Sequence, residues 1–414
     1  MKKVVLSIIA LATVAMAVDI DHPHERIEEK KSTTQAELKN NIAHMEADLA
    51  KMKANLVTEK TEESILDKLH FKGDLRVRHE IIERDDYKTT EGDQNKYRNR
   101  YRLRLGAHVD LTEKLHFEVG MRSGFANPTS GNQTFLDDEH LKDYFFESLR
   151  FNVLGLAYKS GNSTYKVGRQ PYMMYRPIKS QLVWDNDVSL NGLNYQYKDD
   201  TKIITLGADR PTLEENSDAK DTVNLFIAQY VQKIKLESAK LNLGTGVYYY
   251  DGLKGNTTLF GSRKGNTLDA NDLYENDYHM VEGFGELQFK DVLGKPFKVA
   301  AGVVYNFGAD EKNFGYDLAF QIGKAEKVND WQVKYSYTDL QEDATYGAYS
   351  DSDNFGGGTA SKGHAIRAKY KFEKNVYLAG NFFFNKTYES NTKTISPKAT
   401  PDYERVQLDL ILKF

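Results

Sequence analysis

The densest group of chemically capable side chains is a run of arginines at every second position, namely Arg98, Arg100, Arg102 and Arg104. Alternate residues of a β-strand point to opposite faces, so the four guanidinium groups would share one face while mostly apolar residues occupy the other. Guanidinium groups stay charged and match carboxylate and phosphate oxygens in a bidentate geometry. The spacing therefore predicts a strand with one strongly basic face.

Other alternating segments carry basic residues at matching positions. These residues are Arg76, Arg78, Arg122, Arg367, Lys369 and Arg405. An arginine that faces lipid at the middle of a bilayer costs roughly 2 to 4 kcal/mol. In a membrane barrel the basic face would thus line the interior, across from the acidic side chains expected on the inner wall at Glu282 and Glu286.

Two interpretations of the arginines remain open from the sequence. In the first they are structural, and they pair with Asp74, Glu80, Asp110 and Glu118 to hold neighbouring strands together. In the second they set the selectivity of a pore, because a ring of fixed positive charge lowers the barrier to anions. The two interpretations predict different conductance in mutants.

The first 66 residues are expected to lie outside the barrel. Lys2 and Lys3 precede an apolar run that ends in Ala-Met-Ala at 15–17, which predicts a signal peptide over residues 1–17. In residues 18–66 apolar side chains recur at spacings of four and three, a heptad pattern. They are Leu38, Ile42, Met45, Leu49, Met52 and Leu56. This pattern predicts a short periplasmic coiled coil that joins protomers or reaches the cell wall, or else a lone amphipathic helix lying against the barrel.

Residues 67–414 predict an all-β membrane domain, a closed antiparallel barrel. Alternating segments are separated by seven short turns and eight long connections, which together join about 16 strands. The expected turns are 111–114, 160–163, 199–202, 236–239, 291–296, 327–330 and 373–375. The last segment places Leu410, Leu412 and Phe414 on one face and ends on the aromatic, which resembles the assembly signal of outer-membrane barrels. Barrels of about 16 strands leave an aqueous channel.

Several stretches resemble a known family. They are Gly-Asp-Leu-Arg-Val-Arg at 73–78, the arginine run at 98–106, Asn-Pro-Thr-Ser-Gly-Asn-Gln-Thr at 127–134, Gly-Arg at 168–169, and Trp-Asp-Asn-Asp at 184–187, which leads into Asn-Gly-Leu at 191–193. Together they resemble the Putative porin family of Gram-negative outer-membrane β-barrels, most clearly from about residue 70 to 195. The resemblance implies a single barrel that acts as a passive channel, and it implies no particular substrate and no catalytic residues.

The third long connection is the candidate constriction of such a pore. By analogy with trimeric porins whose third loop folds inward, it would narrow the channel. Its candidate residues are Arg176, Lys179, Trp184, Asp185 and Asp187. The alternative is an exposed loop at the mouth of the barrel.

Several classes of chemistry find no support in the sequence. The absence of cysteine excludes disulfides and thiolate metal sites. His22 and His24 flank a proline and are expected to be solvated, so no metal and no cofactor is predicted. Neither H-E-x-x-H nor G-x-S-x-G occurs, so we expect no enzyme. A formal net charge of −4 gives no reason to expect a nucleic-acid partner.

These features predict an outer-membrane porin through which small hydrophilic solutes and ions diffuse passively, with a weak preference for anions. The expected partners are outer-membrane lipid, further copies of the chain in a homotrimer, the barrel assembly machinery and peptidoglycan. Three alternatives remain. They are a solute-specific channel, a structural or adhesive protein anchored through its N-terminal helix, and a barrel enzyme.

Overall fold

The computed structural model describes residues 68–84, 88–89, 92–93, 96–124, 127–135, 149–211, 222–260, 262–388 and 402–414, together with Ala43 and Ala47. The chain forms two compact units, Met1–Glu62 and Glu63–Phe414. The predicted signal peptide, the heptad residues, His22 and His24 all lie outside the described residues. The fold is therefore that of the second unit.

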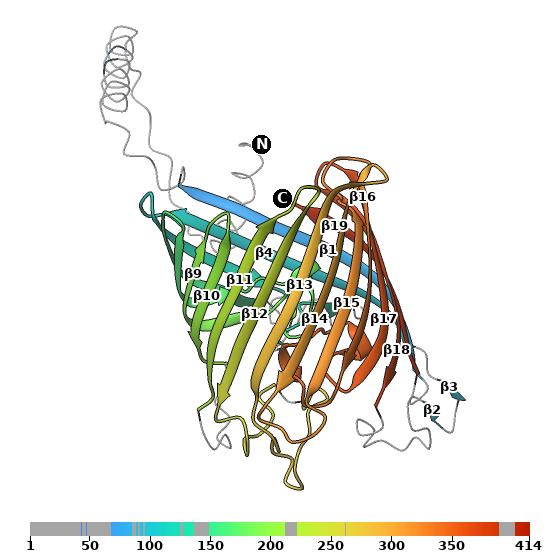
Figure 1. Ribbon diagram of the computed structural model, residues 1–414. Helices are drawn as coiled ribbons and strands as arrows, with labels where there is room; N and C mark the ends of the chain where they lie inside the picture. Colours follow the sequence, from blue (N-terminus) through green and yellow to red (C-terminus); the bar gives the residue numbers. More distant parts are fainter. Residues whose placement is uncertain are drawn as a thin grey trace, which may run out of the picture. The chain divides into compact units, whose positions relative to one another are not determined.

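Sixteen long antiparallel strands of the described residues form a closed barrel (Figure 1). They are β1 (Leu69–Arg84), β4 (Lys96–Asp110), β5 (Leu115–Arg122), β7 (Arg150–Ser160), β8 (Ser163–Pro171), β9 (Ser189–Lys198), β10 (Lys202–Asp209), β11 (Asn224–Lys235), β12 (Ala239–Asp251), β13 (His279–Val292), β14 (Lys295–Asn306), β15 (Phe314–Gly323), β16 (Trp331–Leu340), β17 (Ser361–Glu373), β18 (Val376–Thr387) and β19 (Asp402–Lys413). Because β1 pairs with both β4 and β19, the sheet has no free edge. The predicted barrel of 16 strands is confirmed.

Three short strands lie between the long ones. The strands β2 (Lys88–Thr89) and β3 (Gly92–Asp93) form a two-stranded sheet, and β6 (Gln133–Thr134) pairs with β4. The described residues also include three 3₁₀ turns, namely η2 (Pro177–Lys179), η3 (Gly347–Tyr349) and η4 (Asn354–Gly356). No helix among the described residues has the length and apolar character needed to cross a bilayer.

Seven short turns connect the strands at one end of the barrel, called here the turn end. They occupy residues 111–114, 161–162, 199–201, 236–238, 293–294, 324–330 and 374–375, so all seven predicted turns are confirmed. The residue types are those that favour tight turns. In the turn at 199–201, for example, the Asp199 side chain accepts hydrogen bonds from the backbone N–H groups of Thr201 and Lys202. Eight longer loops, numbered 1 to 8 in chain order, lie at the opposite, loop end (Figure 1).

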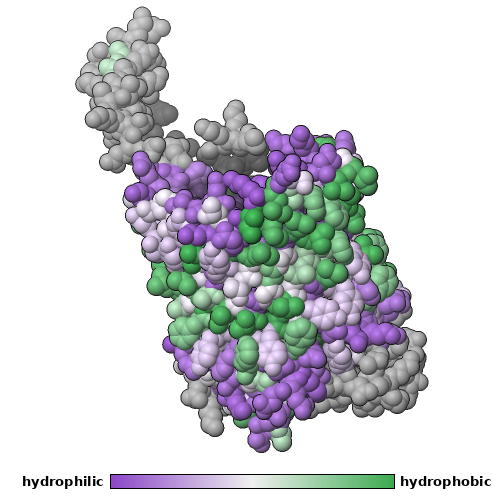
Figure 2. All heavy atoms as spheres, viewed as in Figure 1, coloured by the Kyte–Doolittle hydropathy of each residue, from purple (hydrophilic) through white to green (hydrophobic). Residues whose placement is uncertain are grey.

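The strands alternate between an apolar outer face and a polar inner face. Phe71 and Tyr97 are 70% and 65% exposed on the outside, whereas Arg78 on the inside is 2% exposed. Figure 2 shows the hydrophobic residues gathered in a broad band across the strands, with hydrophilic residues toward both ends. The closed sheet pairs the polar backbone groups with one another, and the apolar outer face matches the hydrocarbon core of a membrane.

The C-terminus completes the closure of the barrel against β1. Backbone N–H groups of Gly73 and Phe414 donate to each other's carbonyl oxygens at 2.8 and 3.1 Å. The Phe414 ring lies over Gly73 so closely that a Cβ at position 73 would be 2.4 Å from it and 2.8 Å from the Arg104 carbonyl oxygen. A glycine is therefore required where the seam closes.

The substitution Gly73→Ala should impair barrel closure. Overpacking of this size costs about 1–3 kcal/mol, so we expect a smaller fraction of heat-modifiable, folded barrel on a detergent gel. Gly283→Ala is the matched control, because a Cβ there meets only Val303 at an ordinary 3.7 Å. Equal folded fractions for the two variants would contradict the steric argument.

Candidate functional site

The inner faces of β1, β4, β5 and β19 carry eight arginines among the side chains that the structure describes, called here the arginine wall. Its members are Arg76, Arg78, Arg98, Arg100, Arg102, Arg104, Arg122 and Arg405. The register places Arg78 opposite Arg100 and Arg76 opposite Arg102, so like charges face each other across neighbouring strands. Such pairs are destabilising unless carboxylates lie between them.

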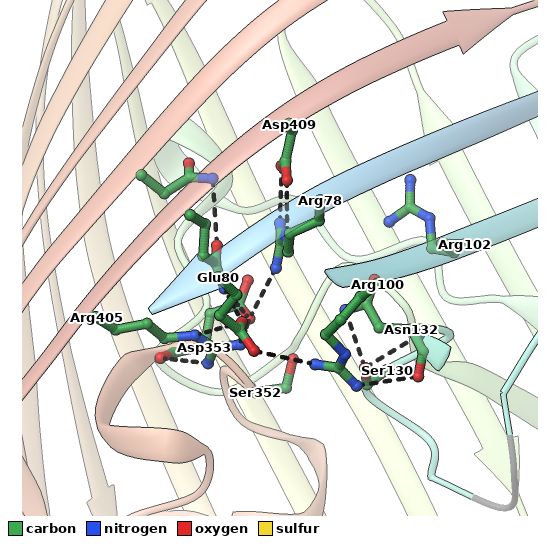
Figure 3. A network of polar contacts seen from close by, with 12 residues as sticks. Arg78, Glu80, Arg100, Arg102, Ser130, Asn132, Ser352, Asp353, Arg405 and Asp409 are labelled. Carbon is green, nitrogen blue, oxygen red and sulfur yellow. Dashed lines mark hydrogen bonds and ion pairs between the residues drawn. The ribbon is translucent and has the colours of Figure 1, made fainter. Parts of the chain in front are cut away.

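Glu80 is the carboxylate at the centre of the wall (Figure 3). Its side chain is completely buried. It accepts hydrogen bonds from the Nε atoms of Arg405 at 2.8 Å and Arg98 at 3.0 Å, and from the Gln407 amide at 3.0 Å. Arg100 Nη1 lies 3.6 Å away. One anion thus holds cations from β4 and β19 on both sides of β1.

A second ion pair crosses the seam where the barrel closes. Arg78 donates through Nε at 2.6 Å and Nη2 at 2.8 Å to the two oxygens of Asp409, which is its direct partner in the register between β1 and β19. The side chains are 2% and 3% exposed. This bidentate pair is therefore shielded from solvent, and each side chain is the closest counter-charge of the other.

The turn-end part of the wall fixes loop 3, residues 172–188. Arg104 donates to the Asp187 carboxylate, and Arg102 donates to Asp74 at 2.6 Å. Arg122 donates to the backbone oxygens of Asn127 and Asp187. Burial opposes ionisation of Asp187, but Arg104, Arg102 and Arg122 outweigh it and lower the pKa of this carboxyl. Asp187 is therefore an anion held among arginines.

Loop 7, residues 341–360, reaches the same wall from the other side. Asp353 lies 3.5 Å from Arg78 Nη1 and 3.1 Å from Arg405 Nη2 (Figure 3). Burial would raise its pKa, but the charges of Arg405, Arg78 and Arg76 lower it instead. The neighbouring Asp351 accepts from Arg367 at 2.9 Å. Loop 7 thus adds anions to those that the strands supply.

Loop 3 runs along the inner wall on the opposite side of the barrel. The Ile178 N–H donates to Glu286 on β13 at 2.6 Å, and Ser180 Oγ donates to Asp317 on β15 at 2.6 Å. Lys334 on β16 donates to the Ile178 carbonyl at 3.0 Å. Ile178 and Lys179 have φ values of 47° and 54°, the left-handed region that is strained for a β-branched residue. Strong anchors hold the loop in this conformation.

Loops 3, 5 and 7 meet in an aromatic cluster inside the barrel. Its members are Trp184, Tyr248, Tyr250, Tyr274, Tyr278, Tyr346 and Tyr349. Trp184 packs against Tyr248 and Tyr349 with ring centroids 5.2 and 5.8 Å apart. Aromatic side chains of this kind each bury about 150–250 Å². The cluster therefore fills part of the barrel interior.

Two neighbouring cavities follow the arginine wall. The outer cavity, about 220 Å³, is lined by Lys96, Arg98, Arg100, Lys264 and Arg405, with Asp353 its one acidic residue. The inner cavity, about 250 Å³, is lined by five basic residues and four acidic ones. These are Arg76, Arg78, Arg102, Arg367 and Lys369, and Asp185, Asp187, Asp353 and Asp409. Thr129, Ser352 and Asp353 line both cavities, so the two lie next to each other, and together they are called here the polar path.

The predicted site residues fall into two groups. Nearly all the predicted arginines, with Lys369, Asp185 and Asp187, line this path, whereas Arg104 and Arg122 hold loop 3 beside it. Arg176 folds back on its own loop, donating to the Ser180 and Trp184 carbonyl oxygens, and Trp184 is 1% exposed in the aromatic cluster. Lys179 borders a separate cavity with Arg176. Some residues of loop 3, such as Trp184, thus pack inside the protein, whereas Asp185 and Asp187 line the polar path.

Glu282 and Glu286 differ from the expectation of an acidic wall facing the lumen. They point inward but are 5% and 2% exposed, because loop 3 and Tyr248 cover them. The acids that do face the arginines come from β1, from β19 and from loops. Besides Asp74 and Glu80 on β1, they are Asp185, Asp187, Asp353 and Asp409, of which the sequence indicated only Asp185 and Asp187. Of the anticipated pairs, Asp74 and Glu80 do bind arginines, whereas Glu118 lies 3.7 Å from Lys166.

Comparison with known families decides what this barrel is. The model of the family described as Putative porin matches residues 62–284 and 274–414, which is most of the chain. The chain belongs to this family. Membership makes it an outer-membrane channel protein, and the resemblance found in its arginine and loop motifs is confirmed. Porins are channels and not typically enzymes.

One of three similar solved structures shows the same fold, at low sequence identity. OprB of Pseudomonas putida at high pH is 13% identical, covers 86% of this porin and 96% of its own chain, and has a TM-score of 0.56. An OmpF of Salmonella typhi in complex with daunomycin is 12% identical, with coverages of 84% and 97% and a TM-score of 0.48. A mutant porin of Rh. blastica is 11% identical, with coverages of 84% and 100% and a TM-score of 0.47. No curated protein matches the chain.

The pair Arg78–Asp409 should stabilise the porin strongly. Removing one partner of a buried pair costs about 3–5 kcal/mol when the other charge is left uncompensated. Here Asp353 would remain 3.5 Å from Arg78, and Arg76 would remain 3.9 Å from Asp409. We therefore expect Arg78→Gln and Asp409→Asn each to lower the free energy of unfolding by up to that amount, measured by denaturant titration in lipid. The double variant should lose clearly less than the two single losses together. Additive losses would show that the two side chains act independently.

Proposed function

We propose that this porin lets small hydrophilic solutes and ions diffuse through the polar path along its arginine wall, with a weak preference for anions. The observation that carries the proposal is the lining of the outer cavity, where five basic side chains accompany one acidic side chain. Fixed positive charge on a water-filled path lowers the barrier to anions relative to cations.

The ion pairs of the wall leave a positive excess. Glu80 is shared by Arg98, Arg100 and Arg405, so one negative charge serves three cations. Asp74 is likewise shared by Arg102 and Arg104. Arginine remains charged at any physiological pH. Both early interpretations of the arginines therefore contribute to the proposal, since the same side chains pair with carboxylates and still outnumber them.

Loop 3 is the proposed constriction. Its Asp185 and Asp187 line the inner cavity together with Arg76 and Arg102. Gln181 and Asn186, from the same loop, line this cavity as well. A solute passing this point would meet both signs of charge at short range, so we expect the preference for anions to be modest there and to arise chiefly in the outer cavity.

We further propose a homotrimer that assembles in the outer membrane with the help of the barrel assembly machinery. In this proposal residues 18–66 form a periplasmic helical segment that joins protomers or contacts peptidoglycan, residues 1–17 are removed on export, and residues 67–414 form the pore. The heptad spacing of Leu38 to Leu56 supports the helical part. Chemical cross-linking of the full-length mature chain and of one lacking residues 18–66 tests it, and equal trimer yields would contradict the role of the segment.

Single-channel recording tests the proposed selectivity. In Arg98→Gln/Arg100→Gln, Glu80 keeps Arg405 and Gln407 as partners, so the barrel should fold. We expect stepwise conductance in both proteins, anion preference in the wild type, and its loss in the variant, measured as the reversal potential under a salt gradient.

A matched control removes two charges elsewhere. Lys235 and Lys240 are exposed and lie opposite each other on β11 and β12, away from both cavities. Lys235→Gln/Lys240→Gln should keep the wild-type reversal potential. Cation selectivity in the wild type, or equal shifts in the two variants, would exclude the arginine wall as the source of selectivity.

The preference for anions should increase as the pH falls. Burial, together with the charges of Asp187 and Asp351, raises the pKa of Asp185. A carboxyl with a raised pKa loses its negative charge first on acidification, so the inner cavity becomes more positive. We expect Asp185→Asn to remove this part of the pH dependence of the reversal potential between about pH 8 and 5. Glu237→Gln, in an exposed turn, is the control and should titrate like the wild type.

A further inference from the structure

Four potential metal ligands meet on the inner face of the barrel at the turn end. His70 is on β1, His108 and Asp110 are on β4, and His116 is on β5. The register places His70 opposite His108 and Asp110 opposite His116. All four lie at even-numbered positions, as do the inward-pointing arginines of the same strands, so the pleat directs them to the inside. None of them takes part in the arginine wall.

The distances between the donor atoms suit a single small cation. Donor atoms of His70, His108 and Asp110 all lie within 4.8 Å of one another. His70 Nε2 is 3.2 Å from Asp110 Oδ2, His108 Nε2 is 3.9 Å from Asp110 Oδ1, and His116 Nδ1 is 2.5 Å from Asp110 Oδ1. Ligands at about 2.0–2.1 Å from a tetrahedral zinc ion lie about 3.3–3.4 Å apart. Small side-chain movements would therefore convert this group into a coordination shell.

We propose that His70, His108, Asp110 and His116 bind a divalent transition-metal ion, with Zn²⁺ as the best fit. Three imidazoles and one carboxylate are the donors that zinc and its neighbours in the first transition row prefer, whereas Ca²⁺ and Mg²⁺ require mostly oxygen ligands. The site goes beyond the proposed diffusion pore, because passive passage of solutes does not require it.

Hydrogen bonding within the group accounts for only some of its members. His70 and His116 are within hydrogen-bonding distance of Asp110. His108 is not, because its Nε2 is 3.9 Å from the nearest Asp110 oxygen, and its ring stacks on His70 at a centroid distance of 4.5 Å. A shared metal ion would give His108 a ligand role.

A further carboxylate lies next to the group. Glu118 is opposite His108 in the register and 3.7 Å from Lys166. A carboxylate that accepts a hydrogen bond from a ligating histidine orients the imidazole and raises its basicity. A bound ion would also link β1, β4 and β5, the strands next to the seam, at the mouth of the barrel. We therefore expect Zn²⁺ to stabilise the fold as well as to bind.

Calorimetry with ZnCl₂ tests the site in the full-length mature porin, purified in detergent and first treated with EDTA. The N-terminal His22, His24 and His44 are replaced by alanine in every sample, because they could bind zinc independently. We expect one ion per chain, with affinity lowered about tenfold or more by His108→Ala and by Asp110→Asn. His279→Ala is the control and should bind normally, since this ring stacks on Tyr249 at 4.2 Å on a different pair of strands.

A second readout does not depend on the variants folding. Co²⁺ in a tetrahedral nitrogen and oxygen site gives strong visible absorption bands, which Zn²⁺ should displace. The proposal would be overturned if the porin with all four ligands intact showed no such bands with Co²⁺ or no heat of binding with Zn²⁺. Equal zinc affinity in His108→Ala and His279→Ala would also overturn it. Folding of each variant is checked by its heat-modifiable migration, so that loss of binding is not confused with loss of the barrel.

Discussion

The buried carboxylate of Glu80 is the contact on which the rest of this barrel depends. It lies between two strands that bring guanidinium groups to the same depth, Arg98 on one side and Arg405 on the other. An isolated buried charge is very costly, and so is a row of unpaired cations. The Glu80 carboxylate and the neighbouring arginines balance each other's charge, and this allows the first and last strands of the barrel to pair. Closure of the sheet therefore depends on ion pairs as well as on backbone hydrogen bonds.

The same wall determines where the loops lie. Asp187 of loop 3 and Asp353 of loop 7 are each held by two or more arginines, which draws both loops into the barrel. On the far side Glu286 and Asp317 hold the strained turn at Ile178. The loops then bury their aromatic residues against one another, because only the inward conformation brings Trp184 and Tyr349 together. Fixed charges thus organise an apolar cluster that has no direct contact with lipid.

The sequence was sufficient for features governed by local chemistry, and insufficient for those that require register or loop conformation. Period-two alternation and turn residues such as Asp199 identified 16 strands and all seven turns. The role of Asp409 was missed, because its pairing with Arg78 depends on how the two ends of the barrel align. Asp353 lies in a loop with no periodic pattern, so nothing local indicated that it would face the arginines. His70, His108 and His116 are up to 46 positions apart in sequence and become neighbours only through strand pairing.

The aromatic cluster has a consequence for the strength of the field inside the lumen. Water reduces the field of a charge far more than packed hydrocarbon does, and a narrow wet path bounded by weakly polarisable material confines field lines along its length. With tyrosines and a tryptophan filling part of the interior, the positive potential of the arginines spreads into a small volume of solvent. Salt would screen it less than in an open channel of the same strand number. The packing of uncharged rings therefore amplifies the effect of charges that they do not touch.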